Sequence, residues 1–475
     1  MVFSSLEFIF RFLSIFIITY YISPKRFRNF VLLAGSLFFY AWGEPIYLIL
    51  IVLSILVNHR LGRLIEYFLD KRGLCRFFFL LAMFYNFGML LLFKYADFII
   101  DNLNIVFSFA ETHTGYSLPT LHRLGLTLPL GISFYTFQIA SYIIDIYRGK
   151  HKSEKSVLRL GVYLCMFPQL IAGPIIVYPN IAEQMKERTY SLADFEDGLK
   201  TFVIGLGSKV LLANRIFLLW NNIQVTGFDC ISTPLAWLGA FAYSFQIFFD
   251  FFGYSLMAIG LGKMLGFRIP DNFNYPYMAT SVSDFWRRWH ITLGAWFREY
   301  IYIPLGGNRN GRLKTIRNLF LVWALTGLWH GASWNFVIWG LLFFVLISLE
   351  KLFLGKVFRV VPFLGHLYII ALIPVTWILF AITNAHDLWI YFTRLFPFLN
   401  GSSPWSVHHT DYIEALHMYG PLFLVCILFS TPLPTKLYRR FKNNIITLLI
   451  LLAIFWLSIY YLAISSNNPF LYFRF

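Results

Sequence analysis

The sequence predicts an all-α polytopic membrane protein with about eleven transmembrane helices, some of them broken or re-entrant. Composition is the first reason, because hydrophobic residues make up 58% and charged residues only 13% of the 475 positions. Soluble domains carry about 25% charged residues. The second reason is that apolar runs of about 20 residues recur, the length that a helix needs to cross a bilayer. A transmembrane barrel would show short alternating segments instead.

The apolar runs place the membrane segments along the chain. We expect the first to be a transmembrane helix that ends in the cytoplasm rather than a cleaved signal peptide, because the basic cluster follows the apolar run instead of preceding it. The predicted segments are residues 3–22, 30–57, 78–95, 126–147, 157–177, 201–220, 234–262, 318–350, 362–382, 420–432 and 444–465.

The net charge of +16 comes from 39 basic and 23 acidic residues. In a membrane protein such an excess is expected in cytoplasmic loops, so we expect a lipid bilayer, and no nucleic acid, as the partner of the basic residues. The loops predicted to face the cytoplasm are 23–29, 148–159, 263–317 and 435–442, and those predicted to face the periplasm are 96–121 and 383–419.

Turn residues interrupt three of the apolar runs. Gly43-Glu44-Pro45, Pro168 with Gly173 and Pro174, and Trp329–Ser333 lie within runs that have basic loops at both ends. Irregular backbone at membrane depth is tolerated only where it is buried in protein or lines a cavity, so we expect the broken segments to surround an internal chamber. Residues 1–475 read as a single membrane domain, in which 263–317 is a basic, cytoplasmic, partly interfacial insertion.

The first polar motif runs from Ser283 to Arg309. Ser283 or Asp284 is a suitable cap for a helix that begins near Phe285. Tryptophans beside arginines at helical spacing are typical of an interfacial helix, which is the favoured interpretation for Trp286, Arg287 and Arg288. His290 fits that interpretation less well, because it would lie in the middle of the helix between apolar neighbours.

The turn-rich loop from Pro304 to Arg312 closes this motif. Its glycines expose backbone N–H groups and its arginines are suited to bind phosphates. An ordinary cytoplasmic turn explains the same residues equally well.

The second motif is Thr326–Asn335, which contains Trp329 and His330. Nothing charged occurs between Arg317 and Glu350, and an ionisable group in such an apolar run is a functional hypothesis by default. Gly327 and Gly331 allow close backbone approach or a break.

The remaining chemistry is sparse. Asp250 lies in an apolar run, where it could orient a histidine or pair with an arginine of 287–298, although a structural role is the simpler interpretation. The four cysteines are scattered, and the histidines outside the two motifs, including His408 and His409, have no carboxylate at ligand spacing, so we expect no metal. Without a GxSxG elbow or another recognised nucleophile, direct transfer with a histidine as general base is favoured.

The motifs resemble the membrane-bound O-acyltransferase superfamily, and within it the branch of the alginate O-acetyltransferase membrane subunit, which has relatives acting on peptidoglycan and cellulose. The resemblance covers the chain from Phe3 to the terminal Phe470–Phe475. It is carried by the runs Pro129–Gln138, Phe167–Pro174, Phe249–Ser255, Phe285–Arg309 and Gly327–Gly331.

The resemblance implies a helical fold with about eleven membrane segments around a central funnel, and with it a function and a set of site residues. An acetyl group from a cytoplasmic thioester, such as acetyl-coenzyme A, would cross the bacterial inner membrane, and a periplasmic partner of the SGNH-hydrolase type would place it on an exported polysaccharide. No bound cofactor is expected. The implied catalytic residues are His330 and His290; the expected donor-binding residues are Arg287, Arg288, Arg298 and Arg309; and the expected supporting residues are Asp250, Trp329, Asn335 and Glu299.

The sequence departs from that branch at four positions: Val177, Phe252, Leu256 and Glu299 stand where Arg, Ser, Asp and Asp are usual. Both histidines are intact, so the departures bear on the acceptor and the partner. Two alternatives from other classes stay open at this point, a non-enzymatic polysaccharide or lipid transporter and a scaffold for periplasmic enzymes. A transporter would be expected to show paired interrupted helices in two halves, which the sequence lacks.

Overall fold

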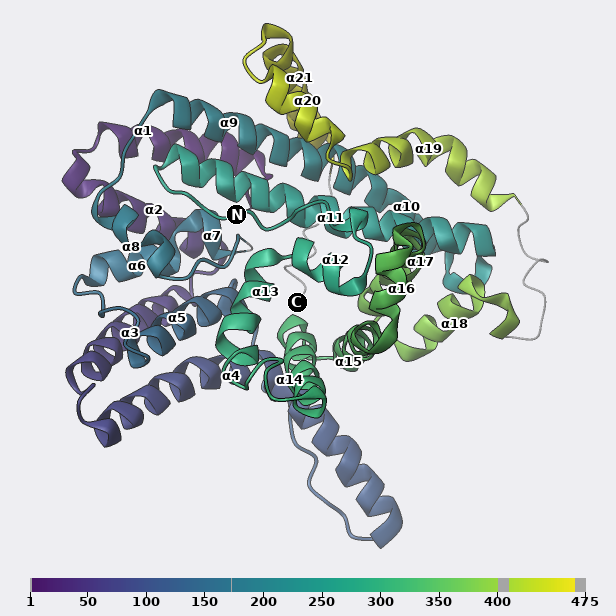
Figure 1. Cartoon of the computed structure of the whole chain (residues 1–475), viewed down its shortest axis with the longest axis horizontal. Coiled ribbons are helices and arrows are strands. Elements are labelled where there is room, and N and C mark those ends of the chain that lie inside the picture. The colour runs from purple at the N-terminus through teal and green to yellow at the C-terminus, as the bar shows by residue number, and fades with distance from the viewer. Residues whose placement is uncertain (1, 172, 400–409, 466–475) are drawn as a thin grey trace. The chain divides into compact units, whose positions relative to one another are not determined.

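The computed structural model describes residues 2–171, 173–399 and 410–465, so His408, His409 and Phe470–Phe475 lie outside the described residues. Within them the fold is helical throughout and contains no strand (Figure 1). The α-helices are α1 Ser14–Ile22, α2 Arg28–Gly43, α3 Leu48–Tyr67, α4 Arg72–Thr114, α5 Ile132–Tyr147, α6 Val157–Cys165, α7 Phe167–Leu170, α8 Pro179–Lys186, α9 Leu192–Gly207, α10 Asn214–Thr226, α11 Thr233–Met264, α12 Val282–Arg288, α13 Ile291–Phe297, α14 Arg312–His330, α15 Trp334–Leu349, α16 Gly355–Val360, α17 Pro362–Ala381, α18 Ala385–Leu395, α19 Asp411–Phe429, α20 Leu433–Phe441 and α21 Ile445–Ile464.

Eight helical stretches of the described chain are long and apolar enough to cross a membrane. They confirm a polytopic all-α protein, but they do not confirm a count of about eleven, because several apolar runs are divided into shorter helices. The eight stretches are Leu48–Tyr67, Arg72–Thr114, Leu192–Thr226, Thr233–Met264, Trp334–Val360, Pro362–Ala381, Asp411–Phe429 and Ile445–Ile464.

The helices pack into two compact units. Unit 1 contains Phe10–Thr189 together with the short segment Trp329–Ser333, and unit 2 contains Val2–Ile9, Tyr190–Leu328 and the chain from Trp334 onward. The segment that carries His330 therefore packs with the N-terminal helices. The single-domain interpretation of the sequence stays a prediction.

The three interruptions predicted from turn residues are confirmed as helix ends. In unit 1, α2 ends at Gly43 before α3 begins, and α6 ends at Cys165 just before the short helix α7. The third interruption falls between His330, the last residue of α14, and Trp334, the first residue of α15. Proline and glycine end helices because they remove a backbone donor or adopt other backbone conformations. Whether these segments are re-entrant, and whether they surround a funnel, stay predictions.

Gly131 explains why the Pro129–Gln138 and Phe167–Pro174 runs belong together. Its φ of 74° is left-handed, and a Cβ at this position would lie 2.4 Å from the carbonyl oxygen of Leu170. Only glycine fits both conditions without strain. The turn that starts α5 therefore packs directly on the α7 backbone.

Helix α4 is much longer than the predicted segment 78–95, since it runs for 43 residues from Arg72 to Thr114. At 1.5 Å per residue that is about 65 Å, roughly twice the hydrocarbon thickness of a bilayer. Its last part falls in the predicted loop 96–121, where the Arg123 guanidinium donates two hydrogen bonds to the Asp101 carboxylate. The following chain, as far as Gly125, is thus fastened along the helix by Asp97, Asp101 and Asn104.

In unit 2, α9 and α11 run side by side (Figure 1) and approach each other through glycines. A Cβ at Gly205 would lie 2.6 Å from the carbonyl oxygen of Gly253, and a Cβ at Gly198 would lie 2.6 Å from that of Gly260. Small residues spaced along a helix allow such close backbone contact in membranes. Gly198 and Gly205 thus allow α9 to pack closely on α11.

A test of this crossing is Gly205→Val. We expect the free energy of unfolding to fall by about 1–3 kcal/mol or more. A Cβ at this position would lie 2.6 Å from the Gly253 carbonyl oxygen and 2.7 Å from the Met257 nitrogen, and these backbone atoms cannot move away without disturbing the helix. Thermal unfolding in detergent measures the loss of stability. The matched control is Gly88→Ala on α4, where a Cβ would meet nothing within 4 Å. Equal stability of the two variants would contradict the close crossing.

The 263–317 region differs from the expected single helix. Ser281, and not Ser283 or Asp284, caps α12 by accepting a hydrogen bond from the Asp284 N–H. Helix α12 ends at Arg288, and α13 begins at Ile291. His290 lies between the two helices, so its predicted mid-helix position is wrong.

Candidate functional site

The Trp329–His330 end of α14 is held by residues of α4 and α5 in unit 1. The Trp329 indole N–H donates to the Ser133 carbonyl oxygen at 3.4 Å. Phe134 lies edge-on to the Trp329 ring at 5.3 Å between centroids, and Phe137 contacts it at 5.8 Å. The Trp329 and His330 side chains are both buried, with 5% and 3% of their surface exposed. Trp329 therefore holds the backbone that carries His330, and its supporting role in the site stays a prediction.

Lys94 of α4 also contacts this end of the helix. Its Nζ lies 2.5 Å from the Trp329 carbonyl oxygen, 3.2 Å from Ser133 Oγ and 3.4 Å from the His330 carbonyl oxygen. The sequence interpretation did not identify this residue. Its signal was present, because Lys94 is a single lysine at the end of the predicted apolar segment 78–95.

His290 occupies a strained position in unit 2. Its φ of 46° and ψ of 53° are left-handed, a conformation that costs a non-glycine residue about 1–3 kcal/mol and that clusters at functional sites. Backbone hydrogen bonds hold the bend, since the Ile291 N–H donates to the Asn272 carbonyl oxygen and the Asn274 N–H donates to that of Arg288. The bend turns the imidazole onto Phe251 of α11, with ring centroids 4.7 Å apart.

The Asn272 side chain orients the His290 ring. Asn272 Oδ1 lies 3.1 Å from His290 Nδ1 and also accepts from the Thr292 N–H and Oγ1. Asn272 Nδ2 donates to Ser255 Oγ, which assigns the acceptor role to Oδ1. His290 Nδ1 therefore carries the proton, and the basic lone pair of the neutral ring is on Nε2. Burial lowers the pKa of His290 to about 3, so the ring is neutral at physiological pH.

Asn272→Ala should weaken this part of unit 2. We expect a loss of about 2–3 kcal/mol, because the substitution leaves the Thr292 N–H and the His290 N–H without the oxygen that accepts them. Chemical or thermal unfolding in detergent measures the change. Asn308→Ala, at an exposed loop position, is the control and should be neutral. An Asn272→Ala variant as stable as the control would show that this network does not hold the bend.

The predicted donor-binding arginines are distributed along unit 2. Arg287 and Arg288 both pair with Asp284, at 3.5 and 2.9 Å, and Arg287 is largely exposed. Arg298 begins the π-helix η6 Arg298–Tyr302, and Arg309 is exposed in the loop that follows.

The loop backbone corrects one expectation about anion binding. The Gly306 and Gly307 N–H groups donate to the Ile303 and Tyr302 carbonyl oxygens inside the turn, so these glycines do not present free N–H groups to a phosphate. Asn318 of α14 in turn donates to the Leu305 and Gly307 carbonyl oxygens. The arginine side chains, and not a glycine nest, are what this loop offers to an anion.

The supporting residues have structural partners. Asp250 Oδ1 pairs with Lys209 Nζ at 2.6 Å, with both side chains at most 3% exposed, so the ion partner shown for Asp250 is a lysine rather than an arginine of 287–298. Lys209 lies in the π-helix η3 Ser208–Ala213 and also donates to Asn214 Oδ1. Asn335 donates to the Leu379 and Phe380 carbonyl oxygens and ties α15 to α17. Glu299 lies in η6.

Glu350 was not identified from the sequence but positions α12. Its carboxylate accepts hydrogen bonds from the Val282 N–H, the Ser283 N–H and Ser283 Oγ. A carboxylate at a helix N-terminus satisfies unpaired N–H groups and complements the helix dipole. Only the spatial contact reveals this role, because Glu350 is separated from Ser283 by 67 positions.

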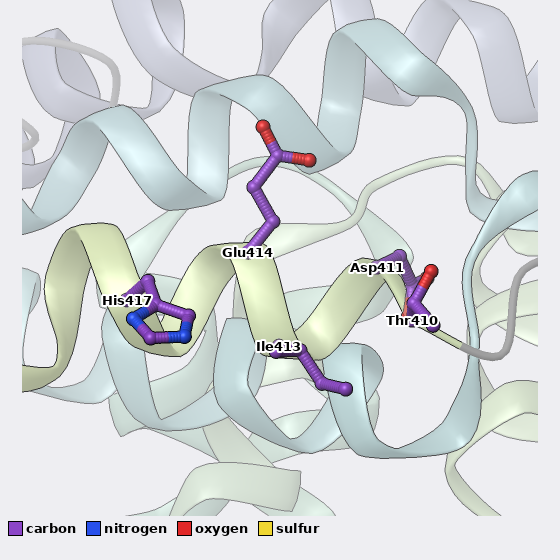
Figure 2. Close-up of a pocket in the computed structure, with 5 residues that line it drawn as sticks. All are labelled: Thr410, Asp411, Ile413, Glu414 and His417. Atoms are coloured by element: carbon purple, nitrogen blue, oxygen red, sulfur yellow. The ribbon is translucent and has the colours of Figure 1, made fainter.

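A pocket lies away from these residues, at the start of α19 (Figure 2). Asp411 of this pocket accepts hydrogen bonds from the N–H and hydroxyl of Ser232, the residue that caps α11. Helix α19 begins at Asp411, inside the predicted loop 383–419, because apolar residues extend the span toward the N-terminus. No group of three or more possible metal ligands occurs within the ranges that the structure describes. The residues that line the pocket are Thr410, Asp411, Ile413, Glu414 and His417.

Comparison with known proteins places these features in a family. The model of the membrane-bound O-acyltransferase (MBOAT) family matches residues 152–386, a range that includes both motif histidines. The "probable alginate O-acetylase AlgI" of Pseudomonas putida is 35% identical over the whole of both chains. The chain belongs to the MBOAT family. It is therefore an acyltransferase with a multi-pass membrane fold, and a non-enzymatic role is no longer needed to explain it.

Two further relatives of this MBOAT protein are also named as O-acetylating proteins. The "probable alginate O-acetylase AlgI" of Pseudomonas aeruginosa is 38% identical over 84% of this chain and 75% of its own length. The "peptidoglycan O-acetyltransferase" of Helicobacter pylori is 33% identical over 98% of this chain and 94% of its own. Both names denote transfer of an acetyl group to an oxygen.

Proposed function

We propose that the chain passes an acetyl group from a cytoplasmic thioester donor across the membrane for O-acetylation of an exported cell-surface polysaccharide, with His330 as the general base. One observation carries the proposal. His330 is the ionisable side chain at the broken end of an apolar helix in an MBOAT protein, and Trp329 and Lys94 fix the backbone on which it stands.

The proposed step balances as a direct transfer. His330 accepts the proton of the acceptor hydroxyl as its oxygen forms a bond to the thioester carbonyl carbon. The carbon–sulfur bond then breaks, and the proton passes from the imidazolium to the leaving thiolate. A histidine is suited both to accept the hydroxyl proton and to give it to the thiolate, because the ordinary pKa of its side chain lies near 6.5. The neutral His290, held by Asn272, acts as an auxiliary group that positions or polarises the thioester.

The donor is acetyl-coenzyme A or another acyl thioester, and the exposed Arg309 with Arg287 attracts its phosphates. The setting is the bacterial inner membrane, with a periplasmic partner of the SGNH type completing delivery. Alginate is the first choice of acceptor because of the full-length similarity to an alginate O-acetylase. Peptidoglycan is the second choice, because the peptidoglycan O-acetyltransferase of Helicobacter pylori aligns with 98% of the chain. Cellulose is the third choice.

The test is transfer in proteoliposomes that contain the full chain, with the SGNH-type partner supplied on the acceptor face. Acetyl-coenzyme A labelled in the acetyl group is supplied on one face, and oligomannuronate, muropeptide or cello-oligosaccharide on the other. We expect thioester loss and a labelled ester with one acceptor class, in vesicles of one orientation. Thioester that stays intact with every acceptor, while wild-type protein is folded, would overturn the proposed reaction. Labelled ester formed on the donor side alone would overturn transfer across the membrane.

A further inference from the structure

Lys94 is a lysine inside a membrane-spanning helix, and the acidic residue that follows it in sequence, Asp97, accepts hydrogen bonds from the Leu124 and Gly125 N–H groups. Lys94 lies within Arg72–Thr114, one of the eight stretches long and apolar enough to cross a bilayer. No ion pair joins it to a carboxylate within the described ranges. An ammonium group at membrane depth is expensive, and such groups usually pair with acids, line a water-filled path or serve a function.

The partners of Lys94 are oxygens of one small region. An ammonium has three N–H donors, and Lys94 Nζ meets three oxygens, those of the Trp329 carbonyl, the His330 carbonyl and the Ser133 hydroxyl. It also lies 5.9 Å from the Trp329 ring centroid, within the range of a cation–π contact. All of these contacts are within unit 1.

The two carbonyls are the last two of α14, which ends at His330. The final carbonyls of a helix have no intrahelical donor, and they form the negative end of the helix dipole. A cation placed there satisfies them and is itself stabilised. Glycine or solvent usually performs this task, but α14 ends in a buried place, since Trp329 and His330 are 5% and 3% exposed.

We propose that Lys94 is a positioning residue for acyl transfer, acting as a side-chain cap that fixes the α14 terminus and with it the direction of the His330 imidazole. This inference rests on the proposed function of His330. It gives a function to the single lysine of α4, which contacts residues 235 and 236 positions away. A catalytic group must be held within a fraction of an ångström, and a loss of about 1 Å in placement can cost about 100-fold in rate.

The experiment compares four variants of the full chain in nanodiscs. Lys94→Met removes the charge and all three hydrogen bonds, whereas Lys94→Arg keeps a cation that can reach the same carbonyls. Ser133→Ala removes one acceptor and leaves the two carbonyl contacts, so it provides a variant that folds even if Lys94→Met does not. Lys71→Met is the matched control, because Lys71 is exposed next to the start of the same helix.

The two readouts are transfer kinetics and backbone hydrogen exchange of the 326–335 peptide. For Lys94→Met we expect kcat to fall at least 10-fold with little change in donor KM, and exchange to rise in that peptide but not in α9 or α11. Lys94→Arg should recover part of kcat, Ser133→Ala should lose a smaller factor, and Lys71→Met should match wild type.

Three results would overturn the inference. Unchanged exchange in the 326–335 peptide of Lys94→Met would show that Lys94 does not hold the helix end. A rise in donor KM with constant kcat would assign Lys94 to donor binding, and an equal increase in exchange throughout unit 1 would assign it to general stability. If wild-type protein transfers no acetyl group, the proposed function of His330 fails, and with it the catalytic part of the inference; the exchange data still decide whether Lys94 caps α14.

Discussion

Replacement of His330 by Ala should abolish acetylation of the exported polymer while the protein still inserts into the membrane. A sugar hydroxyl is a poor nucleophile until its proton is removed, and a positioned base contributes about 10²–10⁴-fold to such a step. Insertion should survive because the substitution takes an ionisable group out of a buried, apolar setting. The measurement is the acetyl content of the polymer, normalised to the amount of chain in the membrane.

Two further variants make the His330 result specific. His330→Gln keeps a polar side chain of similar size but cannot act as a base, so it should be as inactive as the alanine variant. His386→Ala removes an exposed histidine at the start of α18 and should leave acetylation unchanged. Acetylation at the wild-type level by a well-expressed His330→Ala variant would eliminate the general-base role.

Asp250→Ala should cause the largest loss of stability. The substitution removes the carboxylate that lies 2.6 Å from Lys209 Nζ. The Lys209 side chain is only 1% exposed, so its ammonium would stay buried without that partner. Breaking a buried ion pair by removing one partner costs about 3–5 kcal/mol. We therefore expect little folded protein, and with it loss of activity that is not catalytic in origin. Unfolding in detergent and the yield of monodisperse protein measure this effect.

A double variant separates the ion pair from its individual members. Removing both charges with Lys209→Met and Asp250→Leu should restore most of the stability, because apolar side chains of similar volume replace a buried pair at little cost. Recovery of activity together with folding would assign Asp250 a structural role only. If Asp250→Ala folds as well as wild type, the pair does not stabilise the packing of η3 on α11.

Turn residues and apolar runs were enough to predict the broken helices. Glycine and proline end a helix through local backbone geometry, so the interruption near Gly43 and the one after His330 could be placed without any tertiary information. His330 itself was evident because a single ionisable group in an apolar run has few structural explanations.

Tertiary contacts decided what the sequence could not show. The tryptophans and arginines before His290 have helical spacing, which predicts a continuous helix. A backbone hydrogen bond that Asn272 accepts and one that Asn274 donates impose a bend there. Asn272 is 18 positions from His290 and Glu350 is 67 from Ser283, so neither pairing leaves a local pattern. Lys94 did leave one, as a single lysine at the end of the apolar segment 78–95, but its partners are evident only from the fold.

The pH dependence of a single turnover tests the central claim most directly. Proteoliposomes containing wild-type chain or His330→Gln are mixed with labelled thioester and an acceptor, and the first turnover is followed from pH 5 to pH 9. The proposed mechanism predicts a wild-type rate that falls as pH decreases through the titration of a histidine, because the protonated ring cannot accept the hydroxyl proton. For His330→Gln it predicts a rate at least 100-fold lower, without that titration. A His330→Gln variant with the wild-type rate and the same pH profile would contradict the account, because the base would then be another group.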